Sequence, residues 1–145
     1  MKWMRECGIA LCVGLLSACS TSTMSVKLLT DPEANNNSPL NVSIVYVYDD
    51  KKLLAQMKGL PAQQWFLTKQ QLLSDNPDGL AAVTWQVIPN QSLVLQKVSY
   101  KTSKLIGVLV YAGYFGPGAH RAVLGEYQNL TILLNPKDLM VKNGS

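Results

Sequence analysis

Side chains that could act as nucleophiles, general bases or metal ligands are few in this sequence. Nucleophilic catalysis needs Ser, Thr or Cys beside a base such as His or Lys, and the one histidine, His120, follows the turn formers Gly116-Pro117-Gly118. A zinc site needs several Cys or His ligands, whereas Asp75 and Asp78 form part of a calcium-loop pattern that lacks its closing Glu. We therefore predict no enzymatic activity, no metal site and no cofactor, with His120 beginning a strand at the edge of a loop.

Cys19 is the residue with the most specific chemical prediction. The run Leu16-Ser17-Ala18-Cys19 closes an apolar stretch, Gly8–Leu16, that follows a basic start and is too short to span a bilayer. Two small residues before a Cys are typical of a bacterial lipoprotein signal, which is cut before the Cys and followed by acylation of the Cys thiol and α-amine. We predict a lipoprotein signal peptide over residues 1–18 and lipid attachment at Cys19. The alternative is an ordinary secretory signal that ends near a cysteine.

Cleavage after residue 18 leaves a chain of 127 residues, the length of one domain. Because the other two cysteines fall in the signal peptide, we expect no disulfide. The remaining chain has 11 basic and 8 acidic residues, and Lys51-Lys52 is its one adjacent basic pair, so we predict no nucleic-acid surface. We divide this chain into a lipidated tether over residues 19–25 and a β-sandwich domain over residues 26–145.

Most of the chain has the pattern of short strands separated by turn formers. The run Leu105–Ala112 is apolar on both faces, so we place it in the centre of a sheet. Hairpin-like spacing after Ala82 favours a mainly β, two-sheet sandwich. The expected strands are Val26–Thr30, Leu40–Tyr48, Val83–Ile88, Leu93–Tyr100, Leu105–Gly113, His120–Leu124, Leu130–Leu134 and, with less support from the pattern, Leu139–Val141.

A short helical insertion is predicted between Asp50 and Leu73. Apolar residues there recur at helical spacing, with an interruption at Gly59-Leu60-Pro61, and the stretch has few β-branched residues. Trp65 and Phe66 begin one apolar face. We interpret that face as packing on a sheet; the other interpretation is a ligand site.

The ordered set of these features resembles the TssJ family of type VI secretion lipoproteins. The set comprises the acylated Cys, a loop of turn formers, the strand Pro39–Tyr48, the later run Ile106-Gly107-Val108, and the segment His120-Arg121-Ala122-Val123. In that family a Trp stands where this chain has His120. The family turn Pro-Gly reads Pro89-Asn90 here, and Asn also tolerates the left-handed backbone.

The resemblance implies a transthyretin-like sandwich of two antiparallel sheets with a short helical insertion. It also implies a structural lipoprotein on the periplasmic face of the outer membrane, which binds the periplasmic C-terminal region of TssM and works with TssL. Ser20 after the acylated Cys agrees with outer-membrane sorting. The contact loop, between the first two strands, maps to Asp31, Pro32, Glu33, Ala34, Asn35, Asn36, Asn37, Ser38 and Pro39.

Two other functions and one structural alternative remain open at this point. A periplasmic ligand-binding lipoprotein would need an apolar pocket beside Trp65, Phe66 or Trp85. A pilotin-like chaperone of another secretion system would be mostly helical. The segment Glu33–Asn37 of the contact loop has no apolar residue larger than Ala34, so we expect it to contribute little to the core and to serve a partner. The alternative for the loop is a solvated turn without a partner.

Overall fold

The computed structural model describes residues 20–91, 94–125 and 129–143, so the predicted signal peptide and Cys19 lie outside it. Eight strands, two α-helices and one short 3₁₀ helix follow one another along the chain. They are β1 (Thr21–Thr30), η1 (Ala34–Asn37), β2 (Leu40–Tyr48), α1 (Lys51–Gly59), α2 (Ala62–Asp75), β3 (Leu80–Val87), β4 (Val94–Lys101), β5 (Leu105–Ala112), β6 (Arg121–Leu124), β7 (Asn129–Leu134) and β8 (Leu139–Asn143).

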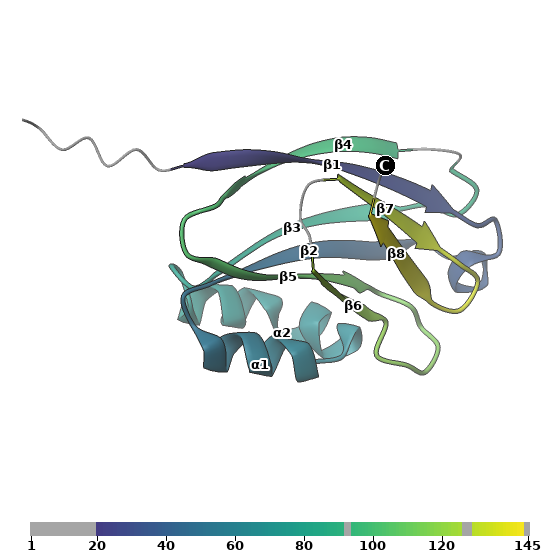
Figure 1. The fold of residues 1–145 in the computed structure, drawn as a ribbon. Coiled ribbons are helices and arrows are strands. Elements are labelled where there is room, and N and C mark those ends of the chain that lie inside the picture. Colours follow the sequence, from purple (N-terminus) through teal and green to yellow (C-terminus); the bar gives the residue numbers. More distant parts are fainter. Residues whose placement is uncertain (1–19, 92–93, 126–128, 144–145) are drawn as a thin grey trace, which may run out of the picture.

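The strands form two four-stranded sheets that pack face to face (Figure 1). One sheet has the order β4-β1-β7-β8 and the other has the order β3-β2-β5-β6. All pairs are antiparallel except β1 and β7, which run parallel with Val26 opposite Leu130. The predicted mainly β, two-sheet sandwich with a helical insertion is confirmed.

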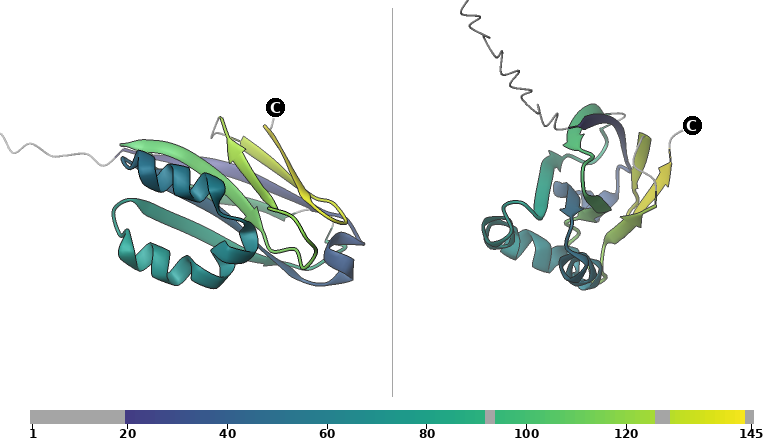
Figure 2. Two further views of the ribbon diagram at one scale, coloured as in Figure 1. Left: turned by 90° about the horizontal axis from the view of Figure 1, so that it is seen from below. Right: turned by 60° about the vertical axis from the view of Figure 1, so that its left-hand side comes forward.

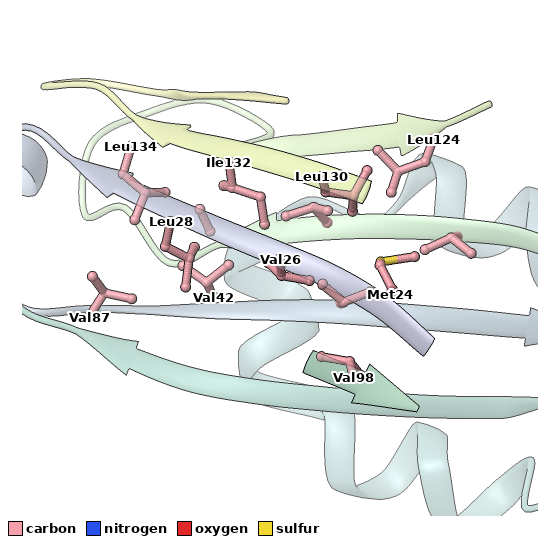
Figure 3. Packing of buried hydrophobic residues seen from close by; sticks show 14 of the residues in the cluster. Met24, Val26, Leu28, Val42, Val87, Val98, Leu124, Leu130, Ile132 and Leu134 are labelled. Carbon is pink, nitrogen blue, oxygen red and sulfur yellow. The ribbon is translucent and has the colours of Figure 1, made fainter. Parts of the chain in front are cut away.

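The main core fills the space between the two sheets. Along β1, Met24, Val26 and Leu28 are at most 1% exposed, and the residues between them are more exposed. This alternation is the period of two that a strand imposes on its side chains. Figure 3 shows the β1 side chains among those of the neighbouring strands in the same sheet and of the facing sheet. Their labelled neighbours are Val42, Val87, Val98, Leu124, Leu130, Ile132 and Leu134.

A second core lies between the helices and the outer face of the β3-β2-β5-β6 sheet (Figure 2). Trp65 of α2 is fully buried, and its ring stacks on that of Tyr111 with centroids 5.4 Å apart. Tyr111 also donates a hydrogen bond from its hydroxyl to the carbonyl oxygen of Met57 in α1. The apolar face that begins at Trp65 therefore packs on a sheet, as the sequence predicts. The strand β2 is apolar along most of its length, and this composition fits a strand that is covered on both faces.

Some boundaries differ from those predicted. The first strand begins at Thr21, five residues before the expected Val26, so residues 21–25 belong to β1 rather than to a tether. They pair with β4, with Thr21 opposite Lys101, and burial of Met24 between the sheets favours this extension. The insertion is two helices, because Pro61 sits at the break between them. The expected start of the fourth strand at Leu93 lies outside the described residues.

Candidate partner-binding surface

Four chain connections meet at one end of the sandwich, on the right in Figure 1. They are the loop at residues 31–39 between β1 and β2, the β3–β4 connection, residues 113–120 between β5 and β6, and the turn at residues 135–138 between β7 and β8. Hydrogen bonds join the first of these to the β7–β8 end: the amide of Asp31 donates to the carbonyl of Leu134 at 2.9 Å, and the amide of Asn35 donates to the carbonyl of Pro136 at 3.0 Å. The predicted loop is thus one part of a larger surface.

The loop between β1 and β2 has an unusual backbone that its asparagines explain. Asn35, Asn36 and Asn37 have φ angles of 51°, 54° and 57°, in the left-handed region. Asn enters this region more readily than other residues with a side chain. At the start of the loop, the Oδ1 atom of Asp31 accepts a hydrogen bond from the Glu33 amide at 2.8 Å, which closes a local turn. The asparagine run is therefore a structural requirement of this tight turn.

Asn35 is the residue that fastens the loop to its neighbours. Its side chain is 4% exposed, and its Oδ1 atom accepts a hydrogen bond from the Phe115 amide at 2.8 Å. Its Nδ2 atom donates to the carbonyls of Pro39 at 3.2 Å and of Ser38 at 3.4 Å. Ala34 is fully buried beside it. The expectation that this loop contributes little to the core is therefore wrong for Ala34 and Asn35, whose backbone and side chains are held by tertiary contacts.

The remaining predicted contact residues divide by exposure. Asp31 and Ser38 are half-buried, while the side chains that face solvent are those of Pro32, Glu33, Asn36, Asn37 and Pro39. A partner can reach only these exposed side chains without unfolding the loop. The other predicted site residue, Cys19, lies outside the described part of the chain.

His120 holds the β5–β6 connection in place. Its ring is 5% exposed, with Nδ1 2.9 Å from Oδ1 of Asp138 and Nε2 2.9 Å from the carbonyl oxygen of Gly116. The expected position of His120 at the edge of a loop is confirmed, but β6 begins at Arg121, one residue after the predicted strand start at His120. Gly118 has a φ of 139°, and a Cβ atom there would lie 2.9 Å from the His120 ring, so this turn requires glycine.

Tyr114 joins the β5–β6 connection to the β7–β8 turn. Its hydroxyl donates to the carbonyl oxygens of Asn135 at 2.8 Å and Asp138 at 3.0 Å. Burial, with the nearby charges of Asp138 and Asp31, raises the pKa of this hydroxyl above its usual value. The hydroxyl therefore stays protonated and remains a donor. Together with Asn35 and His120, it makes the three connections one rigid unit.

Phe115 is an exposed aromatic residue on this unit. Its side chain is 79% exposed, although its backbone amide is fixed by Asn35. Phe115 is not among the residues predicted from the sequence, although an aromatic residue directly before a Gly-Pro-Gly turn is a signal for an exposed contact residue. Beside it lies an open depression of about 1010 Å³. The residues that line this depression are Pro32, Glu33, Asn35, Asn36, Asn37, Asn90, Tyr114, Phe115, Gly116, Pro117, Pro136 and Lys137.

The alternative of a ligand site beside Trp65, Phe66 or Trp85 gains no support from the two depressions described. Neither the depression beside Phe115 nor a second one of about 570 Å³ is lined by any of these three residues. In the described part of the chain, no group of three or more Cys, His, Asp or Glu side chains is placed to hold a metal. Across residues 20–91, 94–125 and 129–143, no helix has the length and apolarity needed to cross a membrane.

No family model matches the sequence, and no curated protein matches it. Solved structures do match the fold. The type VI secretion lipoprotein TssJ1 from Pseudomonas aeruginosa superposes with a TM-score of 0.60 at 13% identity, over 87% of this chain and 98% of that one. The fold is TssJ-like. The predicted resemblance to the TssJ family is thus supported at the level of structure.

Two further structures share this fold. One is Serratia marcescens Lip, described as a membrane-bound component of the type VI secretion system, with a TM-score of 0.58 and 12% identity over 83% of this chain and 96% of that one. The other is a TssM C-terminal domain structure from EAEC, with a TM-score of 0.60 and 16% identity over 83% of this chain and 97% of that one. A pilotin-like chaperone would be mostly helical, whereas this chain is mainly β. The prediction of a helical domain that goes with that alternative is therefore wrong.

Proposed function

We propose that this chain is a structural lipoprotein subunit of a type VI secretion membrane complex. It is anchored by Cys19 to the periplasmic face of the outer membrane and binds the periplasmic C-terminal region of TssM, within the complex that includes TssL. Three observations support this: the lipoprotein signal in the sequence, the TssJ-like fold, and the loop of residues 31–39 locked into a rigid end surface.

The observation that carries the proposal is the exposed ring of Phe115 on that rigid surface. Binding energy at protein interfaces concentrates in a few buried aromatic anchors, surrounded by polar contacts. Phe115 supplies such an anchor, and Glu33, Asn36 and Asn37 supply polar groups beside the same depression. Because Asn35, Tyr114 and His120 already order the backbone there, a partner would bind without the entropy cost of ordering the loop.

Phe115→Ser tests this assignment. We expect at least a tenfold loss of affinity for the TssM C-terminal periplasmic domain of the same organism, about 1.4 kcal/mol, measured by isothermal titration calorimetry. Leu67→Ser is the matched control, because Leu67 is 73% exposed but lies on α2. Unchanged affinity for Phe115→Ser with a loss for Leu67→Ser would move the interface to the helices. Unchanged affinity for both would remove Phe115 and that part of α2 from the interface.

Cys19→Ser tests the anchor separately. The variant should fold but no longer fractionate with the outer membrane, because Ser cannot carry the thioether-linked lipid and acyl chains provide the membrane affinity. Labelling with a radioactive fatty acid is the measurement. Continued incorporation of label into the Ser variant would place the lipid on another residue.

A further inference from the structure

The folded domain begins directly after the predicted lipid-bearing residue. Ser20 is held by Thr102, in the turn between β4 and β5: the Thr102 amide donates to the Ser20 carbonyl at 3.0 Å. The Thr102 hydroxyl lies 2.9 Å from Ser20 Oγ and 3.2 Å from the Ser20 carbonyl oxygen. Thr21 then pairs with Lys101 in the sheet. Ser20 is thus part of the sandwich and not of a spacer.

We propose that the end of the sandwich formed by the β4–β5 turn rests on the phospholipid headgroups. This inference relies on the acylation of Cys19 in the proposed function. A single residue spans at most about 3.6 Å, and the headgroup region on each side of a bilayer is only several ångströms thick. Acyl chains embedded in the hydrocarbon core therefore hold Ser20, and the turn bonded to it, at the membrane surface.

The side chains at this end fit a headgroup layer. Lys101, Lys104, Asp49 and Asp78 are exposed there, and Lys104 Nζ lies 3.4 Å from Asp49 Oδ2. Charges of both signs match the phosphate and ammonium groups of phosphatidylethanolamine. The large apolar side chains that the described residues expose are Leu67, Ile88, Phe115, Val123 and Met140, none of them in this turn. Contact with headgroups, without insertion into the hydrocarbon core, follows from this composition.

The same arrangement orients the candidate partner-binding surface. The start of β1 and the β4–β5 turn lie at the left end of Figure 1, and the loop that follows β1 lies at the right end. The ten residues of β1 span about 30 Å at the usual strand rise. The surface around Phe115 would then face away from the bilayer, where a periplasmic domain can reach it.

Fluorescence quenching by headgroup-labelled lipid tests the orientation. The acylated mature protein, residues 19–145, is reconstituted in phosphatidylethanolamine vesicles that contain a phospholipid with a nitroxide on its headgroup. Ser103→Cys and Lys137→Cys, one at each end and both exposed, provide single thiols for a fluorophore. With acylation confirmed by fatty-acid labelling, we expect quenching at residue 103 to be at least threefold greater than at residue 137. Equal quenching at the two positions would overturn the proposal.

An inserted spacer provides the control. Six residues that begin with Ser are placed between Cys19 and Ser20, which keeps Ser after the acylated residue and leaves the contact with Thr102 intact. We expect quenching at residue 103 to fall toward that at residue 137 in this variant. Undiminished quenching would mean that the domain approaches the membrane independently of the short connection, which contradicts the proposal. If Cys19 carries no lipid in the labelling experiment, the anchor in the proposed function fails instead.

Discussion

Asn35 shows how one polar residue can connect three chain segments. Its side-chain amide satisfies the Phe115 amide and the carbonyls of Ser38 and Pro39, while its own backbone amide reaches Pro136. A buried polar group left without its partner costs about 1–3 kcal/mol. The network therefore stabilises the fold and presents Phe115 at the same time.

Asn35→Ala should lower the free energy of unfolding by about 2–4 kcal/mol, because it removes the three part-buried hydrogen bonds that its side chain makes to the Phe115 amide and to the carbonyls of Ser38 and Pro39. Asn36→Ala is the matched control: Asn36 has a similar φ of 54°, but its side chain is exposed. That variant carries only the backbone cost of Ala at positive φ, about 1 kcal/mol. Urea denaturation of both variants gives the comparison, and equal losses would argue against the hydrogen-bonding role of Asn35.

At the scale of the elements, β2 is the strand on which both cores depend. It lies between β3 and β5, with Ile44 opposite Val83 and Val110. Ile44 faces the core between the sheets, and its neighbour Val45 faces the helices. Both side chains are fully buried, so a polar substitution on either face removes β2 from a core.

Ile44→Asp should prevent folding, since an unpaired carboxylate in the core costs several kcal/mol against a total stability of about 5–15 kcal/mol. Asn41→Asp, on the same strand but exposed, is expected to remain folded. Thermal unfolding followed by circular dichroism distinguishes the two. A cooperative transition for Ile44→Asp within a few degrees of the wild type would contradict the burial of that side chain.

The elements themselves could be predicted because their signals are local. The alternation along β2 and the helical spacing from Trp65 are visible in the sequence, and both elements form where expected. The first half of β1 was missed because its Ser and Thr residues are typical of a linker; pairing with β4 and burial of Met24 decide its structure. The burial of Asn35 was missed for the same reason, since its partner, the Phe115 amide, lies 80 residues away.

The whole molecule is built in three layers: a sheet, a second sheet and a pair of helices. Buried tyrosines lie in both spaces between the layers. Burial raises the pKa of the hydroxyls of Tyr46, Tyr111 and Tyr114 above the usual value of 10.0. Nearby Tyr100 and Tyr48 add to this effect for Tyr46, while Arg121 opposes it for Tyr111. The folded protein therefore keeps protons that the unfolded chain releases at alkaline pH.

Stability should consequently fall as the pH rises above about 10, because the unfolded state then binds fewer protons than the native state. Each of the three tyrosines contributes up to about 1.4 kcal/mol per pH unit. Burial also raises the pKa of Tyr48, which adds to the same slope. Tyr46→Phe should reduce the slope by up to about 1.4 kcal/mol per pH unit, and it breaks no hydrogen bond that the described residues make with the Tyr46 hydroxyl. Denaturant titrations between pH 8 and 11.5 measure the slope. An unchanged slope in Tyr46→Phe would exclude Tyr46 as a contributor.

The parallel pairing of β1 with β7 has a consequence for how the chain is made. β1 is the first of these strands to be synthesised, but Val26 can pair with Leu130 only after a further 104 residues have been added to the chain. Until then β1 is a strand with one apolar face and an unpaired edge, a state prone to pair with other chains. Its sheet can be completed only when almost the entire polypeptide is present. We therefore expect the chain to stay unfolded until β7 has been synthesised.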